Sequence, residues 1–195
     1  MKNKIILASK SKVRKDILDF NNILCEVTPS NVDEDSIKEK LLKKKTTPEI
    51  ISKKLAELKA NKVSERKTGK LVLGADSVID LNGRIISKPN DRKEALKILL
   101  ELNGQTHNLI SSVCISKNGS MIWNYTDKAS LTMKQFQEKD LIIYLSKISD
   151  EALYAYNVYQ IEGEGRSLFL KIEGDKDTIM RLPVKKIKEY LNTIK

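Results

Sequence analysis

Two serines and an arginine follow the first apolar run of the chain, in the stretch IILASKSKVRKDIL at residues 5–18. A helix is predicted at 11–20, and the first N–H groups of a helix lack intrahelical partners, so they favour a bound anion. Ser11 is a candidate N-cap, Ser9 offers a second hydroxyl, and Arg14 could clamp a phosphate through two hydrogen bonds. Two interpretations stay open: an ordinary capped helix, or a phosphate-binding site.

A second candidate is Asp76, in the apolar segment LGADS at residues 73–77. Strands disfavour aspartate, and a buried carboxylate without a partner is costly. Asp76 is therefore bonded, metal-bound or functional, or it lies at a strand edge or in a bulge beside Gly74. Lys88 follows on the partner strand of the same predicted hairpin. Strict alternation places Asp76 and Lys88 on opposite faces, and only twist, a bulge or the strand end would bring them together.

Other polar residues have weaker signals. The acidic run NVDED at 31–35 could hold a divalent cation, although such runs more often start solvated helices. Lys59 carries no signal by itself, and His107 is interpreted as a polar edge residue of a strand. Cys25 and Cys114 are interpreted as buried reduced thiols of a cytosolic protein without nucleophilic character. Metal-assisted attack on a phosphate needs a phosphate-binding site, carboxylates and cations. The sequence offers a candidate for each, namely the serine-rich turn, two carboxylate positions and two lysines.

Composition limits the classes of protein that carry these residues. The chain has 195 residues, 40% hydrophobic and 32% charged, which indicates one soluble globular domain over residues 1–195. No apolar run approaches the ~18 residues of a membrane span, and the N-terminus is charged too early for a signal peptide. The net charge of +10 raises a nucleic-acid hypothesis. That hypothesis is disfavoured because the lysines are spread along the chain without interleaved aromatic residues.

The elements that must position these residues follow from hydrophobic periodicity and turn signals. Strands are predicted at 4–8 and 23–27, around the Asn82-Gly83 turn, and around the Asn118-Gly119 turn. Helices are predicted at 11–20, 35–43, 48–66, 91–102, 137–147 and 183–191. Helices early and late with long antiparallel strands between them predict an α/β fold with a mixed sheet.

The order of the motifs resembles the Maf family along nearly the whole chain. The matching segments are LASKSKVRKDIL at the start, VDE at 32–34, AELKA at 56–60, LGADSV at 73–78, SKP at 87–89, LNGQTH at 102–107 and the series IEG, LF, IEGD and LP from 161 to 183. The resemblance implies an elongated mixed sheet with helices and two lobes around a deep cleft, as in inosine-triphosphatase-like folds. It also implies a nucleoside triphosphate pyrophosphatase with a cytoplasmic house-cleaning role, a link to septum formation, and a homodimer.

The resemblance assigns roles by matching position. Asp76 would be the general base that activates water, with Lys88 beside it in catalysis. Glu34 and Asp76 would hold Mg²⁺ or Mn²⁺, which offsets charge on the phosphate oxygens. The residues expected to bind the triphosphate are Ser9, Ser11, Arg14, Lys59 and Lys88.

Three departures from the family pattern concern substrate specificity. Val13, Ser77 and Glu162 match neither the branch that hydrolyses dTTP and UTP nor the branch that acts on 7-methyl-GTP. A carboxylate at Glu162 would accept hydrogen bonds from the N1–H and amino groups of guanine, which favours a purine. Ser77 resembles the pyrimidine branch instead. A two-residue shift would put Gln160 in the place of Glu162, but the ungapped alignment favours Glu162.

Other departures motivate a second hypothesis. The family's first arginine after the serines is Val13 here, its lysine in the later motif is Ala155, and its glycine before Leu-Pro is Arg181. The loss of two cations suggests a nucleotide-binding regulatory protein of cell division with little catalysis. Measured turnover distinguishes this hypothesis from the pyrophosphatase hypothesis.

Overall fold

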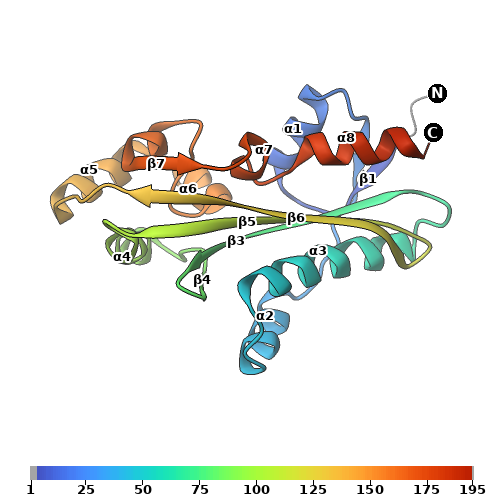
Figure 1. The fold of residues 1–195 in the computed structure, drawn as a ribbon, viewed down its shortest axis with the longest axis horizontal. Coiled ribbons are helices and arrows are strands. Elements are labelled where there is room, and N and C mark those ends of the chain that lie inside the picture. The colour runs from blue at the N-terminus through green and yellow to red at the C-terminus, as the bar shows by residue number, and fades with distance from the viewer. Residues whose placement is uncertain (1–3, 195) are drawn as a thin grey trace.

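A computed structural model describes residues 4–194, apart from the side chains of residues 154–156, and contains an elongated seven-stranded sheet (Figure 1). The strands are β1 (Ile5–Leu7), β2 (Cys25–Val27), β3 (Val72–Leu81), β4 (Arg84–Ile86), β5 (Thr106–Lys117), β6 (Ser120–Met133) and β7 (Phe169–Glu173). Their order is β2-β1-β3-β5-β6-β7, and β4 pairs with β3 outside this path. β1 is parallel to β2 and β3, and the other pairs are antiparallel. The predicted mixed sheet is confirmed.

Helices cover both faces of this sheet (Figure 1). Their bounds are α1 (Lys12–Phe20), α2 (Glu34–Lys43), α3 (Pro48–Ser64), α4 (Arg92–Leu102), α5 (Glu138–Lys147), α6 (Asp150–Tyr156), the 3₁₀ helix η1 (Glu164–Leu168), α7 (Lys176–Ile179) and α8 (Val184–Thr193). α3 packs on β3 and β5 on one face, and α1 and α8 lie over the opposite face. The α/β class is therefore confirmed.

Two apolar clusters divide most of the core along the sheet. The first joins α4 and α5 to one end of β3, β5 and β6, and it includes the fully buried Leu99 and Leu131. The second joins α1 and α8 to β1, and it includes Leu7, Leu18 and Ile187, all 0% exposed. Each such side chain stabilises the fold by roughly 1.5–3 kcal/mol relative to the exposed side chain. The two clusters are the cores of the two expected lobes.

The predicted elements agree with the structure to within two residues at each end. The sequence prediction missed α6, η1, β7 and α7, all of which follow residue 149. These elements are short, and β7 exposes three of its five residues, so it shows no alternation of apolar and polar residues. Periodicity carries little information for elements of this kind.

A close approach between β3 and α3 depends on Gly74. A Cβ at this position would lie 2.1 Å from the Ala56 carbonyl oxygen and 2.7 Å from the Ala60 nitrogen. Both are backbone atoms, so relief requires β3 and α3 to move apart. We expect Gly74→Ala to lower the free energy of unfolding by about 3 kcal/mol, at the upper end for overpacking.

Urea denaturation tests this effect, with Gly163→Ala as the control. A Cβ at Gly163 would meet its nearest atom at 3.5 Å, an ordinary contact. Equal stability of the Gly74→Ala and Gly163→Ala proteins would show that the helix and the strand are not in close contact.

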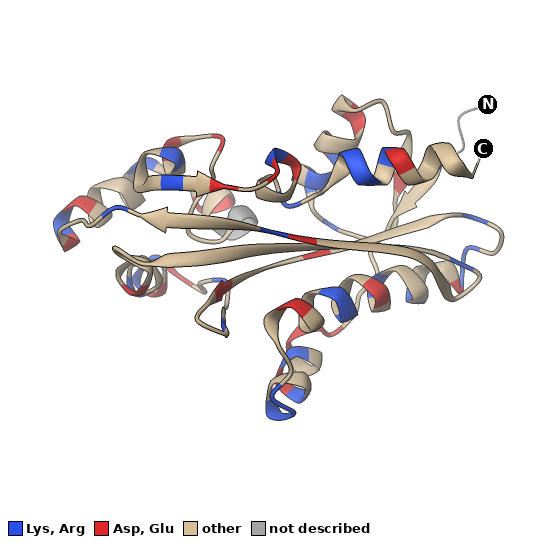
Figure 2. Cartoon of the chain, in the orientation of Figure 1, with Lys and Arg blue, Asp and Glu red and all other residues tan. Residues whose placement is uncertain are grey.

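Charged residues of both signs are interleaved along the helices on both faces of the sheet (Figure 2). Some form exposed pairs within one helix, such as Lys43 with Glu39 and Lys186 with Glu189. Pairs of this kind contribute roughly 0–1 kcal/mol each. In the part of the chain that the structure describes, no helix has the length and apolarity needed to cross a lipid bilayer.

Candidate functional site

A cavity of about 750 Å³ brings together most of the predicted site residues. Its lining includes Ile79 and Ile86 of the first apolar cluster and the start of α1, which packs on the second, so it lies where the two lobes meet. The predicted residues on its wall are Ser9, Ser11, Val13, Arg14, Glu34, Lys59, Asp76, Ser77 and Lys88. Glu162 does not line this cavity. It is exposed at a small hollow that also includes Tyr159 and Arg181.

The two predicted phosphate-binding serines shape the turn into α1. Ser11 is the N-cap, and its Oγ accepts a hydrogen bond from the Arg14 N–H at 3.3 Å. Ser9 Oγ accepts from the Ser11 N–H at 3.2 Å. An N-cap bond of this type stabilises a helix by about 1 kcal/mol. Each hydroxyl keeps its own O–H donor for a ligand in the cavity.

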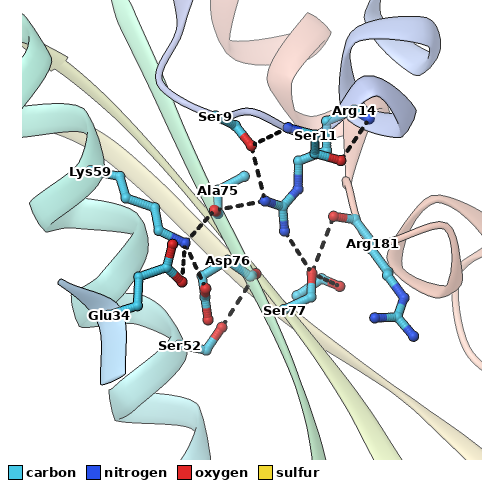
Figure 3. A network of polar contacts seen from close by, with 11 residues as sticks. Ser9, Ser11, Arg14, Glu34, Ser52, Lys59, Ala75, Asp76, Ser77 and Arg181 are labelled. Carbon is cyan, nitrogen blue, oxygen red and sulfur yellow. Dashed lines mark hydrogen bonds and ion pairs between the residues drawn. The ribbon is translucent and has the colours of Figure 1, made fainter. Parts of the chain in front are cut away.

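The guanidinium group of Arg14 is held against β3 (Figure 3). Its Nη1 donates to the Ala75 carbonyl at 3.0 Å, and its Nη2 donates to Ser77 Oγ at 3.3 Å. Burial lowers the pKa of Arg14, and the nearby carboxylates of Asp76 and Glu34 oppose this shift. Arginine stays cationic at neutral pH even so. Arg14 therefore places a fixed, planar positive charge on the cavity wall.

A buried ion-pair network joins α2, α3 and β3. Lys59 Nζ lies 2.9 Å from Asp76 Oδ1 and 2.8 Å from Glu34 Oε2, and the Lys59 and Asp76 residues are each 5% exposed (Figure 3). The β3–β5 register runs unbroken from Val72 to Asp80, so Asp76 lies neither at an edge nor in a bulge. Asp76 Oδ2 is buried and has no hydrogen-bond partner among the described residues. This oxygen therefore keeps its capacity to accept a hydrogen bond.

Lys88 lines the same cavity because β4 ends two residues before it. The alternation that separates Asp76 from Lys88 applies only within the paired strands, so the strand end brings both residues to one cavity. No carboxylate among the described residues forms an ion pair with the Lys88 ammonium group. Burial lowers the pKa of Lys88, and the neighbouring cations Arg181 and Arg14 lower it further. A bound polyanion would relieve this repulsion.

Ser77 and Arg181 connect β3 to the chain after α7. Ser77 Oγ donates to the Arg181 carbonyl at 3.2 Å and lies 3.2 Å from Ser111 Oγ. Arg181 has φ +67°, the left-handed region that favours glycine, and its guanidinium lies 5.9 Å from the Tyr159 ring centre. This backbone conformation accounts for the glycine that the resemblance expects at this position. The Ser77 hydroxyl is expected to determine specificity, but it also holds the backbone at Arg181 through this hydrogen bond.

The interpretation of His107 as a polar edge residue is wrong. His107 is 1% exposed on β5, which has strands on both sides. Its Nε2 lies 2.8 Å from Tyr159 Oη, and its Nδ1 is buried without a hydrogen-bond partner among the described residues. Burial, with a smaller contribution from Arg181, lowers the pKa of His107 to about 4. His107 is a neutral core residue.

We expect this residue to make stability depend on pH. Between the unfolded pKa near 6.5 and the folded pKa of about 4, the unfolded state binds more protons, so stability falls as pH falls. From pH 7 to pH 5 the loss attributable to His107 is about 2 kcal/mol. Urea denaturation at both pH values should show a smaller loss in His107→Gln, which keeps a polar group but does not titrate. An equal loss in both proteins would contradict this role.

Both cysteines are buried free thiols, as predicted. Burial raises the pKa of Cys25 and raises that of Cys114 to about 11. The thiolate is the reactive form of cysteine, so neither residue is activated as a nucleophile at neutral pH.

Asn157 also lines the cavity, although the sequence did not single it out. It is 4% exposed and has φ +67°. Lys38 of α2 lies on the same wall and adds a further cation. The residue type gives no signal at either position, because each reaches the cavity through the packing of its helix.

Comparisons with known proteins found relatives along nearly the whole chain. A family model described as Maf-like protein matches residues 4–194. A nucleoside triphosphate pyrophosphatase of Pelagibacter ubique is 73% identical over 195 residues, with 100% of both chains covered. A 7-methyl-GTP pyrophosphatase of Mesorhizobium japonicum is 39% identical over 194 residues, covering 100% of this chain and 98% of that protein. A solved HAM1 protein from Coxiella burnetii has a TM-score of 0.50 at 13% identity over 98% of each chain, which shows similarity of fold.

Proposed function

This chain belongs to the Maf-like protein family, and on that premise we propose that it hydrolyses nucleoside triphosphates to a nucleoside monophosphate and diphosphate. The observation that carries the proposal is the Asp76 carboxylate. It is buried, one of its oxygens has no hydrogen-bond partner among the described residues, and the cations Arg14 and Lys88 line the same cavity. A carboxylate facing cations is the arrangement that attack of water on a phosphate requires.

In this mechanism Asp76 acts as the general base. Its Oδ2 accepts a hydrogen bond from the attacking water and takes the proton as the water oxygen bonds to the α-phosphorus. The bond between the α-phosphorus and the bridging oxygen breaks, and diphosphate leaves. Lys59 holds the other Asp76 oxygen at 2.9 Å, so the base is fixed in one orientation before the substrate binds.

The cations on the wall bind the triphosphate in this proposal. Arg14 is anchored to the β3 backbone and presents a planar donor group, which suits phosphate oxygens. Lys88 supplies a second positive charge on the wall of the same cavity, and the Ser9 and Ser11 hydroxyls supply short-range donors. These groups stabilise the charge that develops on the leaving diphosphate.

We propose that Mg²⁺ or Mn²⁺ assists the reaction, held by Asp76 and Glu34. The fit rests on the all-oxygen donor set, which suits hard cations, and on the two lone pairs of Asp76 Oδ2, one for the attacking water and one for the metal. Among the described residues no group of three or more His, Cys, Asp or Glu side chains is arranged to hold a metal ion, so substrate oxygens and waters would complete the shell. When bound, the metal would neutralise phosphate charge and polarise the bond to be broken.

The proposal also concerns which nucleobase the protein prefers. Val13 places an apolar side chain on the cavity wall, and Ser77 places a hydroxyl there. Glu162 would act on a purine base from the neighbouring hollow that shares Arg181 with the cavity. The purine preference therefore stays a prediction, as do a cytoplasmic location, a homodimer and the absence of nucleic-acid binding.

A nucleotide panel tests the function. The purified protein, with Mg²⁺ or Mn²⁺, is incubated with the natural ribo- and deoxyribonucleoside triphosphates and with 7-methyl-GTP, and the products are separated by chromatography. We expect equal amounts of monophosphate and diphosphate from at least one nucleotide and loss of turnover with a chelator. Release of orthophosphate would contradict the proposal. Tight binding without turnover of any nucleotide would favour the regulatory alternative.

A further inference from the structure

Asn157 is a buried amide on the cavity wall that the mechanism above does not use. It follows α6 with φ +67° and ψ −138°, a backbone conformation typical of glycine in tight turns. An asparagine that simply ends a helix adopts positive ψ near +47° instead. Strained residues of this kind are kept where the surroundings hold them, often at ligand sites.

A long hydrogen bond to Ser87 orients the Asn157 amide. Its Nδ2 donates to the Ser87 carbonyl at 3.5 Å, and a carbonyl only accepts, so the amide oxygen points away from Ser87. Asn157 Oδ1 is buried and has no hydrogen-bond partner among the described residues. Buried side-chain oxygens without a partner are rare in folded proteins. The wall of the cavity therefore contains a buried acceptor that lacks a donor.

The chemistry of the substrate limits what can supply that donor. An ionised triphosphate offers only acceptor oxygens, so it does not satisfy an amide oxygen. The nucleoside offers donors, namely the sugar hydroxyls and the N–H groups of the base. Ser87 directly precedes Lys88, so the amide is tethered next to a residue that binds the phosphates in the proposed function. A nucleoside attached to those phosphates lies within the same cavity.

We propose that Asn157 Oδ1 accepts a hydrogen bond from the nucleoside part of the substrate and so helps to determine specificity. The inference rests on the proposed function, because it takes a nucleoside triphosphate as the ligand. It adds a residue that contacts the nucleoside to the residues that contact the phosphates.

Asn157→Gly tests this role without disturbing the backbone, since glycine adopts the observed conformation readily. We expect kcat/KM for the preferred nucleotide to fall about tenfold, as for a lost hydrogen bond to a buried group. Inhibition by inorganic tripolyphosphate should stay unchanged. The matched control is Asn82→Gly, which has φ +53° in the exposed β3–β4 turn. An unchanged kcat/KM for every nucleotide, or equally weakened tripolyphosphate inhibition, would overturn the proposal.

Substrate analogues distinguish the two sources of the donor. If a sugar hydroxyl is the donor, the variant should lose the preference of the wild type for the ribo- over the 2′- or 3′-deoxynucleotide. If a base N–H is the donor, the variant should instead lose discrimination against the N-methylated base. Retention of every wild-type preference would mean that only a water molecule satisfies the amide oxygen, and would overturn the proposal.

Binding measurements separate this inference from the proposed function. If the wild type cleaves no nucleotide, the proposed function fails, and calorimetry then compares nucleotide and tripolyphosphate affinity in the wild type and in Asn157→Gly. A tenfold weaker nucleotide affinity with unchanged tripolyphosphate affinity supports the Asn157 contact. Equal affinities in both proteins reject it.

Discussion

Asp76→Asn is expected to lower kcat about a thousandfold while the protein stays folded. The asparagine side chain has nearly the same shape but accepts no proton from water, and general-base catalysis contributes 10²- to 10⁴-fold to rates. Lys59 keeps the Glu34 carboxylate at 2.8 Å as a counterion, so no buried cation is left without a partner. Steady-state assays of diphosphate release measure the loss, and circular dichroism confirms the fold.

Asp80→Asn is the matched control, because Asp80 lies on the same strand and its Oδ1 accepts from the Gly83 N–H in the turn. An asparagine oxygen makes the same bond, so activity should stay within a factor of two or so of the wild type. If Asp76→Asn kept more than about a tenth of wild-type activity, another group would have to be the base.

Lys59→Met is expected to cost about 3–5 kcal/mol of unfolding free energy and to abolish activity. Methionine fills much of the same volume, but Asp76 and Glu34 then face each other without the cation between them. Removing one partner of a buried ion pair leaves an uncompensated charge, which is the costly outcome. Urea denaturation of the variant measures the loss.

A double variant separates charge from packing. Lys59→Met combined with Asp76→Asn removes both buried charges of the pair, so it should be more stable than Lys59→Met alone. The exposed control, Lys54→Met on the same helix, breaks only the surface pair with Glu57 and should change stability by roughly 0–1 kcal/mol. If Lys59→Met and Lys54→Met were equally stable, the buried network would not stabilise the fold.

Local sequence signals predicted much of this fold. The long strands β3, β5 and β6 have marked turn residues at both Asn-Gly turns, and the helix α3 begins at a proline, so their positions follow from propensity and periodicity. The elements between residues 150 and 179 were not predicted, because they are short and are stabilised by tertiary contacts. His107 was misplaced because a histidine at the start of a strand is usually exposed, whereas the rings of Tyr159 and Phe169 pack against this one.

The candidate site was predicted in part from physics and in part from resemblance. The cost of burying a carboxylate marked Asp76, and the serine-capped helix start marked Arg14. Lys59 gave no signal of its own, since its pairing with Asp76 depends on how α3 packs on β3. Asn157 was missed for a similar reason, because its backbone conformation and buried amide depend on contacts with Ser87.

Hydrolysis in ¹⁸O-labelled water, with the nucleotide that the panel identifies, tests the central claim most directly. Attack of water on the α-phosphorus, with Asp76 as the base, predicts ¹⁸O in the nucleoside monophosphate and unlabelled diphosphate, and no comparable turnover by Asp76→Asn. Mass spectrometry of both products reads the label. Label in the diphosphate, formation of a nucleoside diphosphate with orthophosphate, or equal rates for both proteins would contradict it.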